Sequence, residues 1–139
     1  MQDQLEKNLT ELEGVGWAAP DFDSHVVRES NRLRLVPLGE LTVENLRLLI
    51  GQRIGLTYLV PLAIEHLEAN PLVEGDYYPG DLLASVVGTY RDFWTTHGHL
   101  RLRMCDIVSN AVSLVNSIDL PDNVRQKLAY QLNAFNGET

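Results

Sequence analysis

The segment that most constrains the fold runs from Thr57 to Ala69, because its hydrophobic residues cover two sides of a helix. One face carries Leu59, Leu62, Ala63 and His66, and the other carries Val60, Ile64 and Leu67. A helix that is apolar on two sides needs neighbours on both, so we expect this segment to be the most buried helix. Asn70 and Pro71 predict its end.

A second helix is predicted immediately before it. Thr42 is suited to cap its N-terminus, and Glu44 lies in the first turn, where the helix dipole favours a negative charge. Its hydrophobic residues recur with helical spacing and indicate one buried face: Val43, Leu46, Ile50 and Ile54. Gly55 predicts the end of this helix.

The flanking sequence shows the same helical periodicity. Ser24 predicts the cap of a helix that ends before Pro37, with inward residues Val26, Val27, Ser30 and Leu33. Asp81 predicts the start of a helix with a broad stripe of Leu82, Leu83, Val86, Val87, Tyr90, Phe93 and Trp94. After Gly98, a long seam comprises Leu100, Met104, Ile107, Ala111, Leu114 and Ile118. A final helix from Pro121 to Gly137 presents Val124, Leu128, Leu132 and Phe135.

These patterns predict an all-α fold. We expect residues 1–139 to form a single compact domain of about six to eight helices with short connections. A chain of 139 residues is long enough to bury its own core. The sequence contains neither a long apolar run typical of a membrane helix nor a signal peptide, and Cys105 is its only cysteine. A cytoplasmic protein without membrane association is therefore expected.

The net charge of −8 is unevenly distributed. Residues 1–40 contain eight acids and four bases, residues 41–81 six and two, and residues 82–139 five of each. All excess negative charge thus precedes Leu82. Such a surface repels nucleic acid and attracts a basic protein. The small cluster of Arg28, Arg32 and Arg34 is diluted by neighbouring acids, so we expect no nucleic-acid partner.

No group of residues has the pattern of a catalytic, cofactor or metal site. His97 and His99 would point apart on a helix, and no second cluster completes a zinc site with Cys105. Cys105 is interpreted as a buried thiol, and His66 as a core or half-buried histidine rather than a catalytic one. We therefore expect no catalytic residue, no cofactor and no metal.

The segment from Glu74 to Asp81 combines acids, glycines and tyrosines, and two interpretations fit it. In the structural one, glycines set turns, tyrosines pack on the core and Asp81 caps the next helix. In the functional one, Asp76 and the tyrosines contact a partner protein, because tyrosine is enriched in binding hot spots and acids complement a basic surface.

Several short motifs of this chain resemble one known family in order and spacing. They are Leu41-Thr42-Val43-Glu44-Asn45-Leu46-Arg47, Ile50-Gly51-Gln52, Tyr58-Leu59-Val60-Pro61-Leu62-Ala63, Asn70-Pro71-Leu72 and Glu74 to Leu83, with Trp17, Pro20 and Phe22-Asp23-Ser24 upstream. These residues are similar to the immunity proteins of bacterial contact-dependent growth inhibition (CDI) systems. The resemblance covers mainly residues 9–90.

The resemblance implies a protein that is not an enzyme and that neutralises the cognate C-terminal toxin domain of a CDI effector. We expect a one-to-one complex in which the active site or substrate groove of the toxin, a nuclease, is occluded. The expected toxin-binding residues are Asp21, Asp23, Glu74, Asp76, Tyr77 and Tyr78. Because relatives differ where they bind different toxins, Glu40 and the region after Tyr90 also stay open. The alternative is a small helical ligand-binding or helix-turn-helix regulatory domain.

Overall fold

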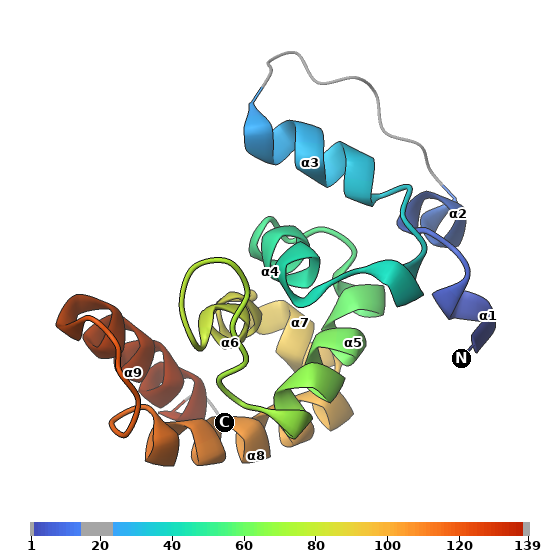
Figure 1. Ribbon diagram of the computed structural model, residues 1–139. Helices are drawn as coiled ribbons and strands as arrows, with labels where there is room; N and C mark the ends of the chain where they lie inside the picture. Colours follow the sequence, from blue (N-terminus) through green and yellow to red (C-terminus); the bar gives the residue numbers. More distant parts are fainter. Residues whose placement is uncertain (1, 15–23, 138–139) are drawn as a thin grey trace.

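The computed structural model describes residues 2–14 and 24–137, which form helices joined by turns and loops (Figure 1). In chain order the elements are α1 (Gln2–Leu5), α2 (Leu9–Glu13), α3 (His25–Leu33), the 3-10 turn η1 (Leu38–Glu40), α4 (Val43–Gly51), α5 (Leu56–Ala69), α6 (Asp81–Val87), α7 (Arg91–Thr96), α8 (Gly98–Leu114) and α9 (Asp122–Gly137). The prediction of an all-α fold is confirmed. Over these residues, no helix combines the length and hydrophobicity that crossing a membrane requires.

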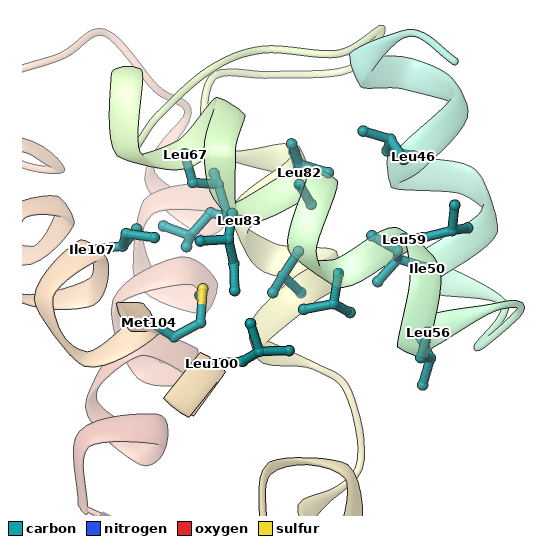
Figure 2. Close-up of a cluster of buried hydrophobic side chains, with 14 of the residues drawn as sticks. Leu46, Ile50, Leu56, Leu59, Leu67, Leu82, Leu83, Leu100, Met104 and Ile107 are labelled. Carbon is teal, nitrogen blue, oxygen red and sulfur yellow. The ribbon is translucent and has the colours of Figure 1, made fainter. Parts of the chain in front are cut away.

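Helix α5 lies at the centre of the core and packs against α4, α6 and α8. Its buried residues lie on both predicted faces: Leu56, Leu59, Val60, Ala63, Ile64 and Leu67. Figure 2 shows side chains from α4, α5, α6 and α8 converging in this cluster, among them Leu46, Leu59, Leu83 and Met104. The two-sided burial expected from the sequence is therefore confirmed.

His66 is an exception on α5, because it is exposed. Glu65, Glu68 and Ala69 are exposed as well, whereas Ile64 and Leu67 are buried. In the last turn of α5, only the side that carries Ile64 and Leu67 therefore packs against the core. The prediction that His66 lies in or beside the core was wrong, because His66 is on the solvent-facing side of this turn.

The outer helices extend the core in two directions. Helix α3 packs on α4 at one end, and α8 packs on α5, α7 and α9 at the other (Figure 1). The turn between α8 and α9 is held by Arg125, whose guanidinium donates to the carbonyls of Val115, Ile118 and Leu120. A cation at this position satisfies carbonyl groups that follow the end of α8.

Helix α4 ends at Gly51, four residues before the predicted end at Gly55. The Ile54 N–H donates to the Leu49 carbonyl and the Arg53 N–H to the Ile50 carbonyl, both at 2.9 Å. This pair of bonds is a Schellman motif, with Arg53 in the left-handed region at φ 59°. Glycine is the usual residue at this position, so the sequence, with an arginine there, gives no signal that the helix ends.

The helix predicted from Asp81 to Trp94 is divided into α6 and α7. The chain turns at Gly88 and Thr89, and Tyr90 adopts an extended conformation before α7 begins. Because of this turn Tyr90 points to solvent, whereas Trp94 reaches α9 and meets Phe135 edge to face at 5.4 Å.

Other predicted features hold with local changes. Ser24 caps α3 by accepting the Val27 N–H at 3.2 Å, but Val26 is exposed. In α8 the predicted seam is buried up to Ala111, after which Leu114 is exposed and Val115 takes its place in the core. Of the four residues predicted to face inward in α9, Leu128, Leu132 and Phe135 are buried and Val124 is partly buried.

The left-handed Arg53 gives a test of the α4 end. That conformation costs a residue with a Cβ roughly 1–2 kcal/mol, whereas glycine costs about 0.5–1 kcal/mol in backbone entropy. The first effect is larger, so we expect Arg53→Gly to raise the free energy of unfolding by about 0.5–1 kcal/mol. Urea denaturation measures this. Gln52→Gly is the matched control, because Gln52 has φ −90° and its replacement should destabilise instead. Destabilisation by both variants would contradict the assignment.

Candidate functional site

The loop of residues 72–80, which connects α5 to α6, is closed on itself at its base. The Gly80 N–H donates to the Leu72 carbonyl at 3.1 Å, and Glu74 pairs with Pro79 in an antiparallel β-bridge. Gly80 adopts φ +94°, and a Cβ there would lie 2.9 Å from Leu128 on α9. The loop therefore packs against the core at a position that only glycine occupies without strain.

A buried carboxylate fixes the middle of the loop. Asp81, only 3% exposed, accepts the N–H groups of Gly75 at 2.7 Å, Tyr77 at 3.0 Å and Tyr78 at 3.4 Å. Asp81 is the first residue of α6, and its side chain bonds the preceding loop instead of capping the helix. Gly80 occupies the cap position, so the prediction that Asp81 caps α6 was wrong. A carboxylate with several backbone donors is a strong anchor, because charge-assisted hydrogen bonds exceed neutral ones.

A second anchor comes from α4. The Nε and Nη2 atoms of Arg47 each donate to the Glu44 carboxylate at 2.6 Å. The same carboxylate accepts the Asp76 N–H at 3.0 Å, and the Arg47 guanidinium lies 4.4 Å from the centre of the Tyr77 ring. In this ion pair on α4, Glu44 therefore binds the loop backbone, and Arg47 contacts the exposed ring of Tyr77.

The electrostatics of this network agree with its geometry. Hydrogen bonds from Arg47 hold the pKa of Glu44 below its ordinary value, and Glu44 in turn raises the pKa of Arg47. Burial raises the pKa of the Tyr78 phenol, and the nearby Asp81 carboxylate adds to this effect. At neutral pH the site therefore presents a charged pair beside a neutral phenol.

The loop leaves a compact set of side chains at the surface. Tyr77 is 68% exposed, Glu74 and Asp76 are exposed, and Tyr78 is half-buried. Beside them lies a hollow of about 320 Å³ that Arg47, Tyr77 and Tyr78 line together with Lys127 of α9. The structural interpretation therefore holds for Asp81 and the glycines, whereas a contact of the exposed Tyr77 with a partner stays a prediction.

The structure brings four of the six predicted toxin-binding residues together, namely Glu74, Asp76, Tyr77 and Tyr78. Asp21 and Asp23 lie outside the described residues. Gly75 lies between Glu74 and Asp76 in the loop, and a Cβ at this position would come within 2.7 Å of Glu44 Oε1 and 3.0 Å of Asp81 Oδ2. The backbone therefore lies directly on the two carboxylates.

Sequence reasoning missed Arg47 and the link between Glu44 and the loop. Glu44 was assigned to the helix dipole, a role that its place in the first turn of α4 allows. The three-residue spacing of Glu44 and Arg47 indicates an ion pair on one helix face. Nothing in that spacing identifies a partner thirty residues later in the chain.

The weaker candidates have structural roles. His97 stacks on Phe93 with ring centres 4.1 Å apart, and its Nδ1 lies 2.8 Å from the Phe93 carbonyl oxygen. Arg32 pairs with Glu29, and the buried Arg34 pairs with Glu13 at 2.7 Å, so these bases form no shared cationic surface. Among the residues that the structure describes, no three His, Cys, Asp or Glu side chains are grouped as metal ligands.

Residues 11–104, about two thirds of the chain, match the family model of the CDI immunity proteins. The chain belongs to the CDI immunity protein family. The matched region contains α4, α5 and the 72–80 loop, whereas α9 lies beyond it. Comparisons with curated proteins and with solved structures give no match for this CDI immunity protein.

The Asp81 anchor can be tested in this CDI immunity protein by removing its carboxylate. Asp81→Ala leaves three N–H groups without their acceptor, and we expect a loss of at least about 2 kcal/mol in the free energy of unfolding. Hydrogen exchange at the Gly75 and Tyr77 amides should accelerate. Asp106→Ala, at an exposed position of α8, should change stability by less than about 0.5 kcal/mol. Unchanged exchange at both amides would disprove the anchor.

The Glu44–Arg47 pair predicts a pH dependence. Because the pKa of Glu44 is lower in the folded chain than its ordinary value of 4.5, the pair stabilises the fold above that value. This contribution is lost as the pH falls through the folded pKa. The stability difference between wild type and Glu44→Gln, measured by denaturation, should therefore be largest near neutrality and shrink below pH ~5. Arg47→Gln should remove the same pH-dependent part of the free energy of unfolding, and the double variant Glu44→Gln/Arg47→Gln should remove no more than either single variant. A stability difference that stays constant with pH would refute the coupling between the two side chains.

Proposed function

We propose that this chain binds the cognate C-terminal toxin domain of a CDI effector, one to one, and neutralises it without being an enzyme. Membership of the CDI immunity family supports the role. The observation that carries the proposed binding surface is the exposed Tyr77 on a loop that Asp81 and Glu44 hold in place. The protein acts in the cytoplasm, where the incoming toxin meets its target.

The proposed contact surface consists of Glu74, Asp76, Tyr77 and Tyr78, extended by Asp21 and Asp23 of the segment outside the described residues. An ordered loop loses little conformational entropy on binding, because its backbone hydrogen bonds are already made. Tyr77 offers a large ring with a polar end, the type of side chain that dominates binding hot spots. The acids around it supply charge complementarity.

We infer that the toxin domain is a basic nuclease and that the immunity protein covers its active site or its substrate groove. The net charge of −8 arises entirely before Leu82, in the part of the chain that contains the 72–80 loop. A nuclease attracts the phosphate backbone of its substrate with positive charge. An acidic surface is attracted to the same region, and this speeds the encounter.

The proposal is tested with the purified protein and the toxin domain encoded immediately upstream. Light scattering after size exclusion should show a one-to-one complex, and the complex should lack the nucleic-acid cleavage of the free toxin. Absence of both a complex and protection would refute the proposed function. A complex of other stoichiometry would refute the one-to-one assembly alone.

The contribution of the loop is measured with Tyr77→Ala. We expect the dissociation constant for the toxin to rise at least about thirtyfold, which corresponds to the ~2 kcal/mol of a hot-spot residue, mainly through faster dissociation. Tyr90→Ala, which removes an exposed tyrosine near α7, should leave the affinity unchanged. Asp76→Asn should slow association at low salt only, since salt screens this charge. Equal effects of the two tyrosine variants would place the binding surface elsewhere.

A further inference from the structure

A second hollow, larger than the one beside the loop, lies where the α6–α7 turn, α7 and the start of α8 meet α9. Its volume is about 570 Å³, within the ~300–1,000 Å³ range of small-molecule sites. We call it the α7–α9 pocket; its wall includes Thr89, Trp94, Gln131 and Phe135, and its other lining residues include Arg91, Arg101 and Tyr130. The function proposed above makes no use of it.

The apolar wall of the α7–α9 pocket is aromatic. Trp94 is held edge to face between Phe93, at 5.1 Å, and Phe135, at 5.4 Å. Tyr130, 76% exposed on α9, stands at the side of the pocket. Such a wall suits a flat apolar or aromatic body, because rings gain by stacking or by edge-to-face contact.

The charge of the lining is opposite to that of the protein. Arg91 and Arg101 are its charged residues, and no aspartate or glutamate is among the described residues that line it. In a chain of net charge −8, a described lining that includes Arg101 and no acid favours an anion. Guanidinium groups match a carboxylate especially well, because both are planar and bond in pairs.

Unpaired polar atoms are concentrated in the same wall. Trp94 Nε1, Thr89 Oγ1 and Gln131 Oε1 are buried without a hydrogen-bond partner in the part of the chain that the structure describes. Trp94 is 5% exposed and Thr89 6% exposed. All three atoms are inaccessible to water, and Gln131 Oε1 can only accept, so they belong to the buried layer behind the pocket surface and are not contacts for a ligand.

We propose that the α7–α9 pocket binds a small organic anion, a carboxylate carried on an aromatic body. The ring lies against Trp94 and Phe135, and the carboxylate accepts from Arg101. The size of the pocket, its aromatic wall and its cationic lining support this ligand class together. The proposal is independent of toxin binding, since it concerns the free protein.

The test uses two pairs of probes that differ only in charge: phenylacetate with phenylacetamide, and indole-3-acetate with indole-3-acetamide. Binding is followed by NMR at the indole N–H of Trp94, which is assigned with Trp17→Phe because the chain has two tryptophans. We expect each carboxylate to shift the Trp94 signal and to bind at least about tenfold more tightly than its amide. Equal affinity within both pairs, or no shift by any probe at millimolar concentration, would overturn the proposal.

A matched pair of variants on α8 locates the anion. Arg101→Gln removes a lining cation and should weaken carboxylate binding at least about tenfold, with no effect on the amides. Arg103→Gln makes the same change two residues away, at a side chain that pairs with Glu68 at 2.6 Å, and should leave binding unchanged. Circular dichroism verifies that both variants are folded. Equal losses in the two variants would show a general charge effect and overturn the assignment.

Discussion

The buried carboxylate of Asp81 is the interaction on which the candidate surface depends. It joins the first turn of α6 to the loop before it by accepting three backbone N–H groups. Helix α6 packs in turn on α4, whose Glu44 bonds the neighbouring amide of Asp76. Two acids from separate helices therefore accept hydrogen bonds from the backbone of the same loop. Burying a carboxylate is costly unless it is well bonded, and here the loop backbone supplies the bonds.

The distribution of charged residues divides the chain into two regions of different net charge. The acidic region before Leu82 includes the 72–80 loop, where a guanidinium beneath Tyr77 orients an aromatic ring among acids. The region after Leu82 is balanced in charge and supplies all of the described lining of the α7–α9 pocket, which contains arginines and no acids. Gln131 of α9 lines both hollows and thus lies between the two regions.

Much of the fold could be predicted from local patterns. The caps Ser24 and Thr42, the break at Asn70 and the two-sided burial of α5 follow from residue type and spacing, and all agree with the structure. The family resemblance and the position of the acidic loop were also accessible. Features that depend on tertiary contacts were not. Arg53 ends α4 where glycine is usual, Asp81 bonds a loop, and Arg47 meets Tyr77 across thirty residues. Spacing within one helix contains no information about such partners.

The anchors of the loop are bonded to main-chain amides, and this has a consequence for how the surface can diverge. Glu44 and Asp81 recognise the N–H groups of residues 75–78, which every amino acid except proline provides. Only Gly75 is sterically fixed among them. The outward side chains at positions 74 and 76 are thus uncoupled from the scaffold that positions them, whereas the Tyr77 ring also contacts Arg47. Substitutions at positions 74 and 76 could therefore accumulate one at a time while the protein stays folded at each step.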